Sequence, residues 1–142
     1  MAAEPQSVIP IESDADVVTA RQRARELAGE LELTTTDQTL LATAISEVAR
    51  NIAMYAKRGE VVLTVIHDDG GRSGIQVVAR DEGPGIEDVE LALQDGYTSG
   101  TGLGLGLPGA RRLVDDFCIE TAVGQGTTVT LVMWARPNAR AA

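Results

Sequence analysis

A strand-like run that ends in an acidic, glycine-rich turn places the strongest constraint on the fold of this chain. Residues 75–80 are rich in β-branched side chains, and the sequence DEGPGI follows them directly at 81–86. A carboxylate at a strand end, followed by two glycines one residue apart, sets a group that only accepts hydrogen bonds beside backbone that a flat ligand can approach closely. We therefore expect a purine site at Asp81, Gly83 and Gly85.

A helix expected over residues 34–56 carries two polar residues beside its apolar stripe. Glu47 and Asn51 are four residues apart, so their side chains lie one turn over the other. An asparagine carbonyl oxygen suits a Mg²⁺ ion that keeps most of its water and holds phosphates, and a carboxylate nearby could accept a proton from an attacking hydroxyl. These residues alone leave open the alternative in which Glu47 pairs with Arg50 in solvent and Asn51 is a surface amide.

A tract with glycine at alternate positions precedes the third expected helix. These glycines are Gly100, Gly102, Gly104 and Gly106. Their backbone N–H groups could point at anions beside the positive end of the helix dipole, which predicts a phosphate cradle; a plain flexible linker is the alternative. A G-x-G-x-x-G pattern is present, but no strand precedes it and no βαβ repeat fits, so a dinucleotide fold is excluded. No glycine is followed by lysine, which excludes a Walker loop.

The remaining periodicity predicts one α/β domain over residues 7–135, with flexible tails at 1–6 and 136–142. The expected strands are 7–11, 60–67, 74–81, 117–121 and 127–134, and the expected helices are 14–31, 34–56, 86–93 and 109–116. Pro10 cannot donate to a β-ladder and so predicts an edge strand. The two strands that flank residues 68–73 should form a hairpin. Thr127 follows a glycine at a strand start, where its hydroxyl could share the carboxylate of Asp81 through water, although a threonine also simply suits a strand.

Composition and charge narrow the classes of partner. The chain has 142 residues, 44% of them hydrophobic, which is enough for one domain with a core. Its formal net charge of −9 would on average repel phosphate backbones, so we expect no nucleic-acid partner. The apolar runs are strand-sized, so we expect no membrane segment and a cytoplasmic location. The single cysteine, Cys118, is expected to be a small core residue.

Taken together, these motifs resemble a known family. The order Glu47-x-x-x-Asn51 on a helix, Asp81-x-Gly83-x-Gly85 after a strand, the glycine tract, and Gly126-Thr127 matches the N, G1, G2 and G3 boxes of the GHKL ATPases. The wider stretches around these boxes are similar to the RsbT-type serine/threonine switch kinases of stressosome modules. The resemblance implies a two-layer α/β sandwich of the GHKL (Bergerat) type, with a mixed, mostly antiparallel sheet and helices on one face. It also implies that the chain uses ATP and Mg²⁺.

The resemblance also implies roles for single residues. Asp81 would accept a hydrogen bond from the adenine amine, Asn51 would ligate Mg²⁺, and Glu47 would orient or deprotonate the attacking hydroxyl. The four alternate glycines would hold the β- and γ-phosphates, and Thr127 would complete the ATP site. One departure from many GHKL enzymes is that residues 86–106 contain no lysine or arginine, so charge neutralisation would fall to Mg²⁺, backbone amides and Arg50 or Arg111.

Partners follow from the same resemblance. RsbT-type kinases phosphorylate Ser or Thr on small STAS-domain antagonist proteins and are released to activate a PP2C-type phosphatase. The main alternative is an anti-sigma factor that sequesters a sigma factor through the same ATP-binding fold. A detached ATP-binding half of a sensor histidine kinase is a third possibility, disfavoured because the sequence shows no dimerisation helix that carries a histidine.

Overall fold

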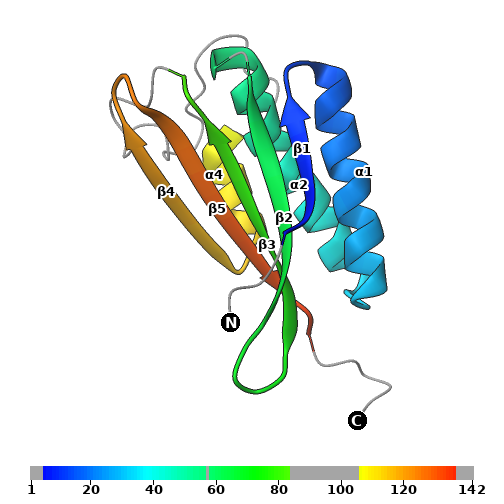
Figure 1. The fold of residues 1–142 in the computed structure, drawn as a ribbon. Helices are drawn as coiled ribbons and strands as arrows, with labels where there is room; N and C mark the ends of the chain where they lie inside the picture. Colours follow the sequence, from blue (N-terminus) through cyan, green and yellow to red (C-terminus); the bar gives the residue numbers. More distant parts are fainter. Residues whose placement is uncertain (1–4, 57, 84–105, 137–142) are drawn as a thin grey trace.

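The computed structural model describes residues 5–56, 58–83 and 106–136, which form an α/β sandwich of two layers. A five-stranded sheet is one layer, and the helices cover one of its faces (Figure 1). The elements are β1 (Pro5–Ile11), α1 (Asp14–Glu30), α2 (Thr35–Asn51), a π-helix η1 (Ile52–Ala56), β2 (Gly59–His67), β3 (Ser73–Asp81), α4 (Gly106–Leu113), β4 (Asp116–Ala122) and β5 (Gly126–Trp134). The predicted fold class is confirmed.

The sheet has the strand order β1-β2-β3-β5-β4, so β3 lies in its centre and β1 and β4 are its edges. Within the described residues each of the four strand pairs is antiparallel. The predicted hairpin is the β2–β3 pair, which extends beyond the helical layer in Figure 1. The strand that contains Pro10 is an edge strand, as its missing N–H predicts.

The core lies between the sheet and the helices. Because side chains alternate along a strand, every second residue of the central strands points at the helical layer. Val77 of β3 is flanked by Leu63 of β2 and Leu131 of β5, and all three are fully buried. Burying each such aliphatic side chain contributes roughly 1.5–3 kcal/mol to folding. The same row of residues fixes the register of β3, and with it the position of Asp81 at the strand end.

The two long helices begin at side-chain caps. The Thr34 hydroxyl accepts a hydrogen bond from the Asp37 N–H over 3.0 Å at the start of α2. At the start of α1, the Asp16 carboxylate accepts from the Ser13 N–H over 3.2 Å. The face of α2 that meets the sheet is made of buried residues at three- and four-residue spacing, namely Leu41, Ala44, Ile45 and Val48. This face fixes the rotation of α2 and therefore the side on which its polar residues emerge.

Two of the predicted helices differ from the structure in their bounds or geometry, and a third cannot be compared with the structure. The helix predicted over 34–56 changes geometry after Asn51, and its last five residues form the π-helix η1. The helix predicted over 109–116 begins earlier, at Gly106, and ends at Leu113. The helix predicted over 86–93 lies outside the described residues.

The expectation for Cys118 was wrong, because its side chain is exposed. Its neighbours on β4, Phe117 and Ile119, pack against the core, so the residue between them points to the opposite face of the sheet. The apolar, strand-like segment around it was predicted correctly, but not which face each residue takes.

Arg136, placed at the start of a flexible tail by the sequence, is held by two carboxylates. Its guanidinium lies 2.9 Å from Asp37 at the start of α2 and 3.0 Å from Asp115 before β4. These two carboxylates, Asp115 first, raise the pKa of Arg136. Arg136 is therefore held against the start of α2 and the residue before β4.

No helix in the described parts of the chain is both long enough and apolar enough to cross a membrane.

Candidate functional site

Asp81 ends the central strand and its carboxylate shapes the turn that follows. One of its oxygens, Oδ1, accepts a hydrogen bond from the Gly83 N–H over 2.8 Å. Asp81 is paired with Gly59 of β2 on one side and with Thr127 of β5 on the other. The carboxylate is therefore held at a fixed place on the edge of the sheet, with acceptor capacity left for a ligand.

Gly83 brings this turn against the helical layer. A Cβ built on Gly83 would lie 2.6 Å from the Cβ of Ala56, which is closer than two carbon atoms can approach. Ala56 ends the π-helix that continues α2, so the small pair allows the turn after β3 to rest on the end of the helix that carries Glu47 and Asn51.

A second contact joins the same two elements. A Cβ on Gly59, the neighbour of Asp81 in β2, would lie 2.9 Å from the Cγ2 of Ile52. Ile52 directly follows Asn51 and is buried. The residue beside Asn51 thus packs on the residue beside Asp81, which brings the two expected ligand-binding positions to the same end of the sandwich.

Gly126 closes the turn from the side of β5. It has a φ of +88°, which disfavours any residue with a Cβ, and a Cβ there would collide with the carbonyl oxygen of Asp81. Its carbonyl accepts a hydrogen bond from the Thr121 hydroxyl over 3.0 Å. The side chain of Thr127, expected in the ATP site, lies 2.9 Å from the same hydroxyl. Thr127 is thus next to Asp81 in the sheet, and its hydroxyl is hydrogen-bonded to Thr121.

Glu47 and Asn51 lie on α2 as predicted, but the surroundings of the two side chains differ from each other. The side chain of Glu47 is 10% exposed and lies 3.0 Å from Arg50 in an ion pair. The pairing weighed as an alternative is therefore present, but the carboxylate is nearly buried rather than in solvent. Asn51 is half-buried, and its side chain makes no hydrogen bond within the part of the chain that the structure describes.

The expected phosphate cradle is described only at its end. Gly85, Gly100, Gly102 and Gly104 lie outside the described residues. Gly106 is the first residue of α4, whose buried residues Leu107 and Ala110 lie in the same core as the apolar face of α2. The start of α4 is thus set by its packing in the helical layer.

Metal binding by several acidic side chains has no candidate in the described residues, where no group of three or more His, Cys, Asp or Glu could hold an ion. A Mg²⁺ ion that keeps most of its waters needs only one or two protein ligands together with substrate phosphates. The half-buried amide of Asn51 fits that requirement. The residues present are therefore compatible with Mg²⁺ shared between Asn51 and a nucleotide.

Sequence reasoning missed three residues that shape this site. Ala56 was predicted as the last residue of a helix, Gly59 lay between that helix and the next predicted strand, and Gly126 was noted only as part of a motif. Each is small because another backbone approaches it, and such contacts join residues far apart in the chain. The only available signal was a glycine directly before a predicted strand, and in the structure Gly59 and Gly126 are the first residues of β2 and β5.

Comparison with known proteins extends these observations. The family model described as the histidine kinase-like ATPase domain matches residues 11–133 of this chain. The chain is 42% identical, over 92% of its own length and 98% of the relative's, to the serine/threonine-protein kinase RsbT of Bacillus subtilis. It is 32% identical to the anti-sigma F factor of Geobacillus stearothermophilus, over 79% of this chain and 80% of that one.

A solved structure has the same arrangement of elements. The chain superposes with a TM-score of 0.57 and 25% identity on the crystal structure of the RsbU and RsbW domains of a Mycobacterium tuberculosis protein. The match covers 94% of this chain and 34% of that longer one.

Proposed function

This chain belongs to the histidine kinase-like ATPase family of GHKL type, and we propose that it is an ATP-dependent protein serine/threonine kinase of the RsbT kind. The observation that carries the proposal is the packing of the turn after β3 on the end of α2. Through Gly83 and Ala56 it brings the carboxylate of Asp81 to the helix that holds Glu47 and Asn51. A purine acceptor, a metal ligand and a base on adjoining elements are what phosphoryl transfer from ATP requires.

The residues have separate roles in this proposal. Asp81 accepts a hydrogen bond from the exocyclic amine of adenine, which selects against guanine because guanine presents an acceptor at that position. Gly83 and Gly85 let the base approach the backbone, Thr127 supports Asp81, and the alternate glycines at 100, 102, 104 and 106 hold the phosphates. Asn51 holds Mg²⁺, and this ion supplies charge neutralisation at the phosphates when it is bound.

Glu47 is the proposed base. The oxygen of a substrate Ser or Thr hydroxyl attacks the γ-phosphorus, its proton passes to the Glu47 carboxylate, and ADP leaves with the electron pair of the broken P–O bond. Glu47→Ala should therefore leave ATP affinity unchanged while it slows transfer by about 10²- to 10⁴-fold. Isothermal titration and the initial rate of phosphate transfer measure the two effects separately. A Glu47→Ala protein with the wild-type transfer rate would remove Glu47 from the mechanism.

The proposed partners are a STAS-domain antagonist protein as substrate and a PP2C-type phosphatase that the released kinase activates. We place this activity in one cytoplasmic domain over residues 7–135. The test is incubation with γ-labelled ATP, Mg²⁺ and candidate STAS-domain proteins, followed by mapping of the labelled residue. Label on Ser or Thr of the partner supports the proposal. Tight ATP binding without transfer to any STAS-domain protein contradicts it.

A second candidate is an anti-sigma factor, because the chain also resembles a protein of that name. In that case the same fold would bind ATP and sequester a sigma factor, and kinase activity would be secondary. Capture of a purified sigma factor at low concentration, with no phosphate transfer to STAS-domain proteins, would favour this candidate over the first.

A further inference from the structure

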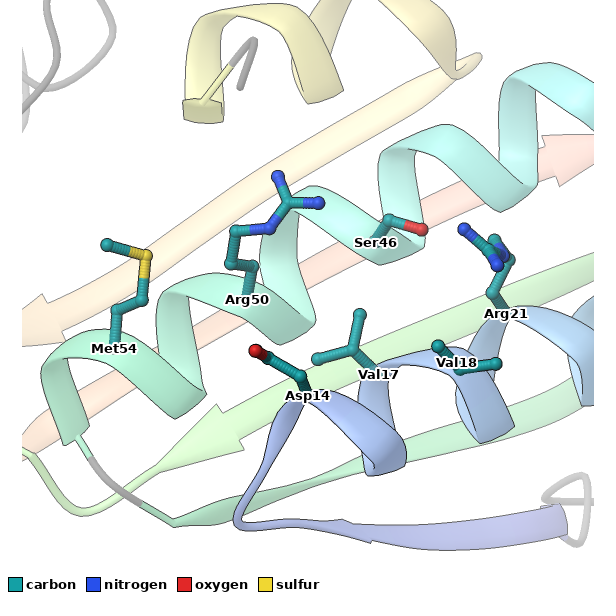
Figure 2. Close-up of a pocket in the computed structure, with 7 residues that line it drawn as sticks. All are labelled: Asp14, Val17, Val18, Arg21, Ser46, Arg50 and Met54. Atoms are coloured by element: carbon teal, nitrogen blue, oxygen red, sulfur yellow. The ribbon is translucent and has the colours of Figure 1, made fainter. Parts of the chain in front are cut away.

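The outer surface of the helical layer has a groove of about 370 Å³ between α1 and α2. Figure 2 shows Asp14, Val17, Val18 and Arg21 reaching it from α1, and Ser46, Arg50 and Met54 from the helix that begins with α2. Arg50 thus belongs to two sets of residues at once, because it lines this groove and forms the ion pair with Glu47.

The two members of that ion pair differ in exposure. The Glu47 side chain is 10% exposed, whereas that of Arg50 is 43% exposed, and the distance between Nη1 and Oε1 is 3.0 Å. A nearly buried carboxylate is costly unless a donor satisfies it, so a cation beside it favours the orientation in which the two groups meet. Glutamate also has considerable rotamer freedom, which a fixed partner removes. Arg50 therefore restricts the direction of the Glu47 carboxylate.

We propose that Arg50 is a positioning residue for Glu47. From the side of the α1–α2 groove, Arg50 holds the Glu47 carboxylate in the orientation needed for phosphate transfer. This inference rests on the proposed function. It differs from a role for Arg50 in neutralising the phosphates of ATP, which the sequence left open. A residue that acts through Glu47 changes the rate of the transfer step, whereas a residue that contacts the phosphates also changes nucleotide affinity.

The first test replaces the charge of Arg50 while retaining the length of its stem. Arg50→Met should lower kcat for transfer to the STAS-domain substrate by roughly 10- to 100-fold, because misplacement of a reacting group by about 1 Å has an effect of that size. The KM for ATP and the affinity measured by isothermal titration should stay within about twofold of wild type. Arg50→Lys retains a cation near Glu47 and should restore part of the rate. Thermal unfolding of each variant identifies any loss of fold.

A double-mutant cycle gives the second and sharper test. If Arg50 acts through Glu47, Arg50→Met should have no further effect on kcat in a protein that already carries Glu47→Ala. If Arg50 had a merely structural role, the two substitutions would act independently, and their fold-changes in kcat would multiply. The matched control is Arg23→Met on α1, because Arg23 and Glu26 form an ion pair with the same i, i+3 spacing, at 3.1 Å. This variant should transfer phosphate at the wild-type rate.

Three results would overturn the role of Arg50 alone. One is wild-type kcat in Arg50→Met. Another is an increase in the KM for ATP with unchanged kcat, which would assign Arg50 to phosphate binding. The third is multiplicative effects in the double mutant. A wild-type protein that binds ATP yet phosphorylates no STAS-domain protein would instead overturn the proposed function on which the inference rests.

Discussion

The Asp81 side chain serves the fold and the proposed ligand through the same carboxylate. An asparagine at this position keeps an oxygen that can accept from the Gly83 N–H, so the turn should persist. Its amide nitrogen is a donor, however, and would face the donor on adenine. Asp81→Asn should therefore weaken ATP binding by roughly 10- to 100-fold, the range expected for loss of a hydrogen bond to a charged group. Isothermal titration measures this change.

The control for Asp81 is Asp69→Asn, which removes the same charge from the exposed turn between β2 and β3. This variant should bind ATP as wild type does. Equal ATP affinity in the Asp81→Asn and wild-type proteins would contradict the role of Asp81 in binding adenine.

Two glycines of the β4–β5 connection allow backbone strain to be separated from collision. Gly124 has a φ of +80° with open space around it, whereas Gly126 has a φ of +88° and lies against Asp81. Gly124→Ala should lower the free energy of unfolding by about 1–2 kcal/mol, the usual cost of a left-handed conformation for a residue with a Cβ. Gly126→Ala should lower it further and should also weaken ATP binding. Urea denaturation compares the two. Equal losses of unfolding free energy in Gly124→Ala and Gly126→Ala would mean that the close approach of Gly126 to Asp81 does not contribute to stability.

Prediction from the sequence succeeded for the place of a residue in the fold where the signal is local, whereas the ligand-binding roles of Asp81 and Gly83 stay predictions. Asp81 and Gly83 could be found because a strand signal, a carboxylate and a glycine are adjacent in the chain. The requirement for small residues at Gly59 and Ala56 could not be found, because it arises from contacts between α2, β2 and the turn after β3. A sequence pattern reports which side chains are neighbours along one element, and these contacts join different elements.

At the scale of elements, the β2–β3 hairpin depends on an aspartate that organises its turn. The Arg72 N–H donates to Asp68 Oδ1 over 2.7 Å, and this bond, together with the Arg72 guanidinium, lowers the pKa of Asp68. Because the pKa of Asp68 is lowered in the folded protein, its ionised carboxylate stabilises the hairpin fully when the pH is above the ordinary pKa of aspartate. This contribution is lost as the pH falls through the lowered pKa of Asp68. Asp68→Asn should therefore be less stable than wild type at pH 7, by a small amount because the group is exposed.

The measurement is the denaturation midpoint of both proteins between pH 7 and pH 2. The difference between wild type and Asp68→Asn should shrink towards acid pH. A difference that is constant over this range would show that the ionised form of Asp68 has no part in the stability of the turn.

Helix and strand prediction was accurate where periodicity alone decides the outcome. The hairpin and the apolar face of α2 follow from alternation and from three- and four-residue spacing, and both are present. The change to a π-helix after Asn51 has no such signal, since the apolar positions around Ile52 fit either helical geometry. The side on which Cys118 emerges depends on the register between β4 and β5, which a strand pattern does not contain.

At the scale of the whole molecule, Arg136 connects the end of the sheet to the start of α2. Asp37 is only 6% exposed in its side chain and would lose its cation in an Arg136→Met protein. Removal of the cation beside a nearly buried carboxylate is more harmful than removal of one from an exposed carboxylate. We expect the melting temperature to fall by about 5 °C. The matched control is Arg80→Met, because Arg80 is equally exposed at 55% but pairs with the half-exposed Glu60.

Differential scanning calorimetry of the two variants measures this effect. A melting temperature that falls equally in both would show that burial of Asp37 adds nothing to the pair. The sequence placed Arg136 in a flexible tail because nothing local marks it as ordered, and its partner Asp37 lies 99 residues away. The fold class could be predicted from element order, but the contacts of Arg136 could not.

The π-helix after Asn51 carries a consequence for insertions and deletions. A π turn accommodates one residue more than an α turn, so deleting a single residue from Ile52–Ala56 would allow regular α geometry to continue. Because the π turn had absorbed that residue, the later residues would keep nearly the same direction relative to the sheet, and Ala56 would stay opposite Gly83. Deleting a residue from the regular turns of α2 would instead rotate every later residue by about 100° and take Ala56 away from Gly83. The π-helix is thus the part of this helix in which the loss of one residue should be tolerated.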